Sequence, residues 1–106
     1  MPKPEVADYI NKLIKENPVM VFSKSYCPAC SRAKRAITGT KGGPEKMKVL
    51  EMDGLPECDD LQDELLSMTG GRTVPRVFIG GKFVGGGDET AALARAGKLE
   101  AMIAAA

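Results

Sequence analysis

The sequence predicts an α/β domain in which helices flank a four-stranded mixed sheet. Helical and strand-like segments alternate in the first half of the chain, a Gly-Gly turn joins the last two strand-like runs, and 106 residues are enough for one hydrophobic core. Parallel strands need a crossover connection, whereas a two-residue turn joins antiparallel strands. The sheet should therefore contain both kinds of pairing.

The first half of the chain alternates between helices and strands. Apolar residues recur at helical spacing over residues 4–16, and the continuous apolar run at 19–22 is typical of a strand covered on both faces. A second helix is expected over 28–38, because a proline is tolerated at the first helical position. Residues 39–44 have the composition of a loop, and a second strand is expected at 48–52.

The second half predicts a helix followed by a hairpin. Asp59 or Asp60 can cap a helix that ends at the glycines 70–71. The runs 76–79 and 82–84 are strand-like, and the two glycines between them are a strong signal for a tight turn. The last two strands should therefore be antiparallel.

The C-terminal segment predicts a final helical region. Asp88 or Thr90 can open it, and Gly97 is expected to interrupt it. A right-handed strand–helix–strand crossover followed by a helix and a hairpin gives a four-stranded mixed sheet between helices. That order is the thioredoxin-like arrangement, and we expect a single domain over residues 1–106.

The composition argues against several classes of partner. Fifteen basic and fourteen acidic residues give a formal net charge of +1, so no field over the whole protein favours nucleic acid or an anionic membrane. The N-terminal segment has no apolar signal core, and no apolar run approaches the ~18 residues of a membrane span. We expect a soluble cytoplasmic monomer, although a trimmed organelle-targeting segment would leave no trace in this sequence.

The most informative motif is YCPACSR at residues 26–32, which contains Cys27 and Cys30. If Pro28 begins a helix, the sulfur of Cys27 faces unpaired backbone N–H groups, whose dipoles favour the thiolate. Lys24 can act in the same direction, although solvent screens exposed charges. The pattern assigns Cys27 as the nucleophile and Cys30, one turn further, as the thiol that resolves a mixed disulfide.

Two other roles compete with redox chemistry at this pair. A free cysteine is often a small buried hydrophobe, but a Cys-x-x-Cys on a strand-to-helix turn favours the redox role. A structural zinc site needs four Cys or His ligands, whereas the chain has three cysteines and no histidine, so we expect no metal requirement. The third cysteine, Cys58, is interpreted as a peripheral thiol in a loop at 56–60.

A second candidate station is Thr73-Val74-Pro75, just before the third strand. Proline cannot donate to a ladder, so it belongs at the first residue of a strand or at an edge. If the Val74–Pro75 bond is cis, the backbone N–H and C=O of Val74 point outward and can pair with an extended peptide. A trans proline starting a strand is the commoner arrangement in general, and the combination with the cysteine turn favours the cis form.

The third candidate station is the run Gly85-Gly86-Gly87-Asp88-Glu89 at a helix start. Backbone N–H groups exposed there can hold a carboxylate, while Asp88 can accept from an ammonium. The α-carbon end of an amino acid carries both groups. Glycine-rich loops before helices are more often simple turns. A binding role for this segment is therefore favoured only in combination with the cysteine motif and the Thr73-Val74-Pro75 segment.

The segments KSYCPAC, LQDEL and GRTVPRVFIGGKFVGG, with the glycine–acidic loop, resemble a dithiol glutaredoxin over nearly the whole chain. The resemblance implies a thioredoxin-like fold, glutathione as co-substrate, and reduction of protein disulfides and protein–glutathione mixed disulfides. Its partners would be glutathione and proteins that are glutathionylated or contain disulfides. A plain thioredoxin is disfavoured, because the chain has no tryptophan to place before its cysteine pair.

The resemblance also assigns a set of residues to the parts of glutathione. The matched positions are Lys24, Gln62 and Arg72 at the glycine carboxylate, Thr73, Val74 and cis Pro75 at the backbone station, Gly87 and Asp88 at the γ-glutamyl clamp, and Tyr26 at an aromatic flank. Taken singly, Lys24 and Arg72 would be solvated surface charges. Their place beside the two motifs is what favours a binding role.

The chain departs from the family pattern at two positions, and one alternative function stays open. Ala29 stands where a tyrosine is common, which removes an aromatic wall, and Gly87 stands where a cysteine is frequent. The alternative is a dimer in which each chain gives Cys27 and one glutathione to a [2Fe-2S] cluster, which thiolate ligation permits. Relatives of that kind tend to carry Gly or Ser at the position of Pro28.

Overall fold

A computed structural model of the chain describes residues 3–106. The elements in chain order are α1 (Pro4–Glu16), β1 (Val19–Ser23), α2 (Pro28–Thr38), α3 (Gly43–Lys46), β2 (Met47–Glu51), α4 (Cys58–Thr69), β3 (Arg76–Ile79), β4 (Lys82–Gly85), α5 (Gly87–Arg95) and α6 (Leu99–Ala105). The alternation expected from the sequence is confirmed, with β2 one residue earlier than predicted.

The four strands form one mixed sheet in the order β2-β1-β3-β4. β1 pairs in parallel with β2, with Val19 opposite Met47, and antiparallel with β3, with Val19 opposite Ile79. β3 and β4 form the expected hairpin. Its turn residues Gly80 and Gly81 have φ of 60° and 83°, the left-handed conformation that a tight hairpin turn requires.

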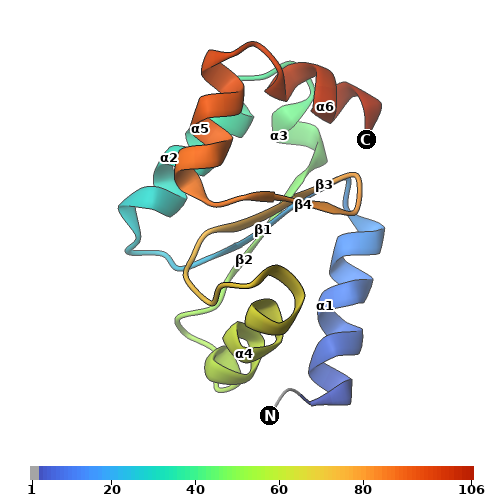
Figure 1. Ribbon diagram of the computed structural model, residues 1–106, viewed down its shortest axis with the longest axis vertical. Helices are drawn as coiled ribbons and strands as arrows, with labels where there is room; N and C mark the ends of the chain where they lie inside the picture. The colour runs from blue at the N-terminus through green and yellow to red at the C-terminus, as the bar shows by residue number, and fades with distance from the viewer. Residues whose placement is uncertain (1–2) are drawn as a thin grey trace.

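Helices cover both faces of the sheet, as Figure 1 shows, and β1 contributes to the core on each side. Val19 and Val21 pack with Ala33 and Ile37 of α2 and with the buried side of α6. The alternate residues of β1 face α1 and α4 instead; that second core contains Val6, Ile10, Ile14, Met20, Phe22, Met52, Leu61, Leu65 and Phe78. A fully buried strand explains why the 19–22 run is apolar throughout.

The predicted start of α4 was wrong. The helix begins at Cys58, with Glu57 at the N-cap position and no side-chain cap, so neither Asp59 nor Asp60 caps it. Backbone hydrogen bonds from Leu55 N to Met52 O and from Cys58 N to Leu55 O lead the chain into the helix by successive turns. The two aspartates lie in the first turn, where the helix dipole favours negative charge.

Two other boundaries differ from the prediction. The segment expected to be a loop at 39–44 runs into α3, which begins at Gly43 after the left-handed Gly42. α5 begins at Gly87 rather than at Asp88 or Thr90, because the carboxylate of Glu89 accepts from Gly86 N at 2.6 Å and so caps the helix at Gly86. The predicted break is confirmed, since Gly97 has a φ of 72°.

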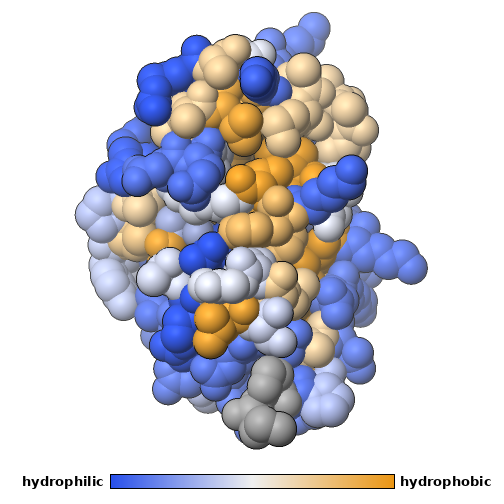
Figure 2. All heavy atoms as spheres, viewed as in Figure 1, coloured by the Kyte–Doolittle hydropathy of each residue, from blue (hydrophilic) through white to orange (hydrophobic). Residues whose placement is uncertain are grey.

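The surface divides into polar and apolar areas on the face drawn in Figure 2. Apolar side chains gather around the β3–β4 hairpin and the C-terminal helices, whereas α1 presents a mainly hydrophilic surface. This matches the helical spacing of α1, whose buried residues Val6, Ile10 and Ile14 all face the sheet.

Candidate active site

Cys27 occupies the N-cap position of α2, immediately after the β1–α2 loop. Pro28 is the first helical residue, as predicted, and the backbone N–H of Cys30 donates to Cys27 Sγ at 3.2 Å. The thiol of Cys27 in turn lies 3.7 Å from the carbonyl oxygen of Val74. The sulfur is therefore placed between a helix N-terminus, which stabilises negative charge, and the segment that precedes β3.

Cys30 has the opposite environment. Its side chain is completely buried, whereas Cys27 is partly exposed. Burial raises the pKa of the Cys30 thiol, and the hydrogen bond with Cys27 raises it further. At neutral pH Cys30 is therefore a protonated thiol behind the accessible sulfur, which fits a residue that acts second.

A polar groove of about 190 Å³ opens beside the pair. The groove joins three segments that are distant in the sequence, and it is lined by Ala29, Arg32, Thr73, Val74, Pro75, Arg76, Gly86, Gly87, Asp88 and Glu89. The Val74–Pro75 bond is cis, as the sequence analysis expected. The structure thus brings Thr73, Val74 and Pro75 into one groove with Gly87 and Asp88.

The far side of the groove is the start of α5. Gly86 N is satisfied by Glu89, and Thr90 N donates to Gly86 O at 3.1 Å, so the backbone N–H groups of the first helical residues have no acceptor within the helix. Asp88 is highly exposed and pairs with Arg32 of α2 at 3.2 Å. The arrangement offers donors for a carboxylate and an acceptor for an ammonium.

The predicted cationic residues lie on separate segments. Arg72 is exposed and pairs with Asp63 at 3.2 Å and with Asp59 at 3.8 Å. Gln62 is only 7% exposed, and its amide donates to Arg72 O at 2.8 Å, so it holds the backbone next to Arg72. Among residues 3–106, no hydrogen bond or ion pair joins the partly buried Lys24 to Gln62 or Arg72.

Known proteins match this chain in sequence and in fold. The family model described as glutaredoxin matches residues 19–84. The crystal structure of oxidized glutaredoxin 2 from Chlamydomonas reinhardtii superposes with a TM-score of 0.91 at 47% identity, covering 99% of this chain and 96% of that chain. This chain belongs to the glutaredoxin family. The expected thioredoxin-like fold is confirmed, and glutaredoxins are oxidoreductases.

Two further glutaredoxins resemble this one closely. A buckwheat glutaredoxin, solved as a complex with glutathione, has a TM-score of 0.85 at 38% identity and covers 98% of this chain and 96% of its own. The rice (Oryza sativa subsp. japonica) protein glutaredoxin-C4, chloroplastic, is 42% identical over 98 residues, which are 92% of this chain and 71% of the relative.

Cys58 of this glutaredoxin was misplaced by sequence reasoning. It is the first residue of α4 rather than a loop residue, and its thiol lies 3.5 Å from Gln62 Oε1. Cys58 therefore contacts the residue that holds the backbone of Arg72. No local pattern pointed to this, because it depends on where α4 begins.

Sequence reasoning also missed two polar contacts on segments next to Cys27, one of them in the glutaredoxin groove. One is the pair between Arg32 and Asp88, and the other joins Ser25 of the β1–α2 loop to Asp53 after β2. Both join residues that are far apart in sequence, so the motif alone carried no signal for them.

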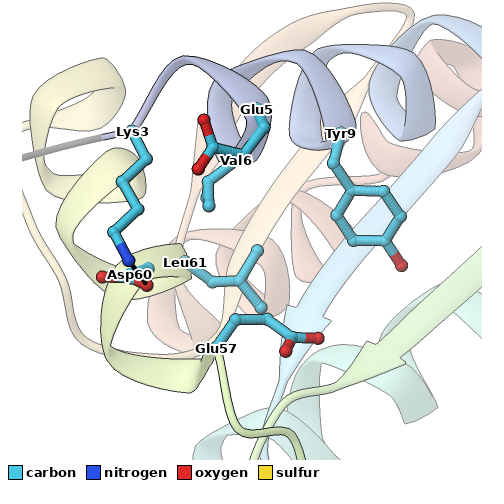
Figure 3. A pocket seen from close by; sticks show the side chains of 7 residues that line it. All are labelled: Lys3, Glu5, Val6, Tyr9, Glu57, Asp60 and Leu61. Carbon is cyan, nitrogen blue, oxygen red and sulfur yellow. Dashed lines mark ion pairs between the residues drawn. The ribbon is translucent and has the colours of Figure 1, made fainter.

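A larger cavity, of about 390 Å³, lies between the N-terminal ends of α1 and α4. Figure 3 shows the side chains that line it, with the ion pair from Lys3 Nζ to Asp60 Oδ2, 3.0 Å long, at one side. The Asp60 carboxylate raises the pKa of Lys3. None of the residues lining this cavity belongs to the predicted glutaredoxin site.

The sequence predicted no membrane span, because no apolar run approaches the necessary length. Within residues 3–106, no helix of this glutaredoxin combines the length and hydrophobicity needed to cross a bilayer.

Proposed function

We propose that this glutaredoxin uses glutathione to reduce protein–glutathione mixed disulfides and protein disulfides, with Cys27 as the nucleophile. One observation carries the proposal: the sulfur of Cys27 accepts from a helix N-terminal N–H at 3.2 Å and lies beside a polar groove. A thiolate is the nucleophile in thiol–disulfide exchange, and the helix end favours that form.

In the monothiol route, the Cys27 thiolate attacks the glutathionyl sulfur of the mixed disulfide. A bond forms between Cys27 and glutathione, the old S–S bond breaks, and the reduced protein leaves as a thiolate that takes up a proton. A second glutathione thiolate then attacks the glutathionyl sulfur on Cys27. Glutathione disulfide leaves and the Cys27 thiolate returns, so the net reaction converts the mixed disulfide and one glutathione thiol into the protein thiol and glutathione disulfide.

The groove matches the chemistry of glutathione, a short peptide with a carboxylate at each end, one ammonium and a central thiol. The open N–H groups at the start of α5 and the carboxylate of Asp88 suit the γ-glutamyl end, and Thr73 and Val74 offer backbone partners. Arg72 and Lys24 suit the glycine carboxylate, while the buried amide of Gln62 supports Arg72 through its carbonyl. The buckwheat glutaredoxin–glutathione complex supports this ligand by similarity.

In the dithiol route, Cys27 first attacks a protein disulfide and forms a mixed disulfide with the protein. Cys30 then attacks the Cys27 sulfur, the reduced protein leaves, and a Cys27–Cys30 disulfide remains, which two glutathiones reduce. Cys30 must lose its proton to attack. Its burial and its raised pKa make this the pH-sensitive step.

Two substitutions test the assignment of roles. We expect Cys27→Ser to abolish turnover of a glutathione mixed disulfide, because serine is a far weaker nucleophile. Cys30→Ser should retain that turnover and lose reduction of a protein disulfide. The measurement is glutathione oxidation coupled to glutathione reductase, with Cys58→Ser as the matched control. Full activity in Cys27→Ser would refute the proposal.

The pH dependence of the two routes should differ. Because the pKa of Cys30 is raised, the ionised fraction of this thiol is small at neutral pH and grows about tenfold per pH unit until the pKa is reached. Protein-disulfide reduction by the wild type should therefore rise with pH across the range above neutrality. The control is a single turnover of pre-reduced Cys30→Ser with a glutathione mixed disulfide and no free glutathione, which removes the ionisation of the glutathione thiol from the measurement. This single turnover should lack the rise seen when the pre-reduced wild type reduces a protein disulfide; identical profiles would contradict the role of Cys30.

The remaining expectations about partners and location stay predictions. A [2Fe-2S] cluster shared by two chains, each giving Cys27 and one glutathione, would appear as visible absorption after anaerobic reconstitution, and a colourless monomer would count against it. The rice relative is named as chloroplastic, so the cytoplasmic location is also still a prediction.

A further inference from the structure

The loop between β1 and α2 presents the reactive residues but has few contacts of its own. It carries Lys24 and Tyr26 and leads into Cys27; Tyr26 keeps 71% of its surface exposed. A turn hydrogen bond from Cys27 N to Lys24 O, 3.2 Å long, closes the loop on itself. An exposed loop of this kind needs an outside anchor if its side chains are to point in one direction.

Asp53 supplies such an anchor. The backbone N–H of Ser25 donates to Asp53 Oδ1 at 3.0 Å, and the hydroxyl of Ser25 donates to Oδ2 at 2.6 Å. Hydrogen bonds to an ionised carboxylate are shorter and stronger than neutral ones. Because both oxygens accept from the same residue, the contact fixes the orientation of the loop as well as its position.

Asp53 is itself held by the sheet. It follows Met52, which is fully buried in the core, and Met52 N donates to Ser23 O at 2.9 Å. The two donors of Ser25 also hold the pKa of the Asp53 carboxyl below its usual value, with a smaller effect from the charge of Lys24. The Asp53 carboxylate is therefore ionised at neutral pH, and its backbone is held in place by the end of the sheet.

We propose that Asp53 is a positioning residue for glutathione-dependent reduction: through Ser25 it fixes the loop that presents Lys24 and Cys27 to glutathione. This inference rests on the proposed function above. Asp53 acts on the placement of the loop rather than on the exchange of sulfur bonds. Its loss should therefore raise KM for the glutathione substrate more than it lowers kcat.

The test measures kcat and KM for the mixed disulfide of glutathione and cysteine, with glutathione as reductant. The variants are Asp53→Ala, Ser25→Ala, the double variant and Ser25→Thr, which keeps both donors and should rescue the contact. Asp60→Asn is the matched control, because it removes another carboxylate, whose one polar side-chain partner within residues 3–106 is Lys3. Amide hydrogen exchange over residues 24–27 reports on the loop directly.

Asp53→Ala and Ser25→Ala should each raise KM about five- to tenfold, as expected when hydrogen bonds to a charged group are lost, with kcat changed by less than about twofold. The double variant should be no worse than the worse single variant, because both remove one contact. Ser25→Thr and Asp60→Asn should match the wild type. Hydrogen exchange in the loop should become faster in Asp53→Ala, Ser25→Ala and the double variant, and should stay at the wild-type rate in Ser25→Thr and Asp60→Asn.

Several results would overturn the inference. These are a wild-type KM in Ser25→Ala, a Ser25→Thr variant as impaired as Ser25→Ala, or additive effects in the double variant. If Asp53→Ala does not fold, the two serine variants decide the question. A wild-type protein that does not turn over the mixed disulfide would refute the proposed function itself, whereas normal wild-type turnover with unaffected variants refutes only the role of Asp53.

Discussion

In the binding mode proposed above, the glycine carboxylate of glutathione would meet the side chains of Lys24 and Arg72, which lie outside the residues that line the groove, whereas the γ-glutamyl carboxylate would meet the backbone N–H groups that begin α5. The Arg72 side chain is 43% exposed, but Gly87 is buried against Ala29 of α2. An exposed side chain can be exchanged without disturbing the fold. The residues that present backbone N–H groups at the start of α5 cannot be exchanged in this way, because they also pack α5 against α2.

The two ends share one property, which is that each has a charged side chain that is already paired within the protein. Arg72 pairs with Asp63, and Asp88 pairs with Arg32, both at 3.2 Å. Exposed ion pairs of this kind contribute roughly 0–1 kcal/mol to stability. A ligand can therefore displace them at little cost, and until then they hold the charged groups near the groove.

The largest effect is expected at the backbone end, from Gly85→Ala. Gly85 has a φ of 133°, and a Cβ there would lie 2.5 Å from the side chain of Glu89, which caps Gly86. We expect a loss of about 1–3 kcal/mol in the free energy of unfolding, the usual range for a side chain in a glycine-only conformation. Glutathione KM should rise as well, because the start of α5 is displaced.

Urea unfolding of Gly85→Ala should be compared with that of Gly54→Ala. A Cβ at Gly54 meets nothing within 4 Å, so this control should unfold like the wild type or slightly later. Equal stability of the two variants would contradict the view that substitutions at the start of α5 disturb the fold.

A smaller and more selective effect is expected from Arg72→Ala at the side-chain end. KM for glutathione should rise about tenfold, the loss typical of one charge-assisted hydrogen bond. The free energy of unfolding should change by less than about 1 kcal/mol, because the ion pairs lost are exposed. Arg72→Lys keeps the charge and should recover part of the loss; a stability change as large as that of Gly85→Ala would contradict the comparison.

The smallest effects are expected when the internal partners are removed. Asp63→Asn removes the nearer of the two carboxylates that pair with Arg72, and Arg32→Ala frees Asp88, so each should lower KM by about twofold if displacing an exposed pair costs a few tenths of a kcal/mol. The gain should disappear at high salt, which screens these charges. A raised KM in either variant would mean that the pair helps to hold glutathione instead of competing with it.

The sequence predicted those parts of the fold and site that depend on strong local rules. The proline after Cys27 starts α2, two glycines form the β3–β4 turn, and the apolar run of β1 is buried on both faces. It failed at the start of α4, where backbone turns from Met52 to Cys58 begin the helix without a side-chain cap.

The contacts between distant segments could not be predicted in this way. Ser25 and Asp53 are 28 residues apart, and Arg32 and Asp88 are 56 apart. Which acid meets which donor depends on the register of the sheet and on how α2 packs on α5. The side chain of Gln62 is another example: the family resemblance predicted a contact with the glycine carboxylate of glutathione, whereas its burial and its bond to the Arg72 carbonyl follow only from the packed structure.

The parallel pairing of β1 with β2 has a consequence for how this chain can change over time. Both strands end at the same edge of the sheet, so Cys27 and Asp53 lie on neighbouring loops while the residues before them fill the cores. Substitutions in these loops can alter substrate preference or reactivity and leave the packing of β1 intact. Selection can therefore change the reactivity of this protein and its folding stability almost independently.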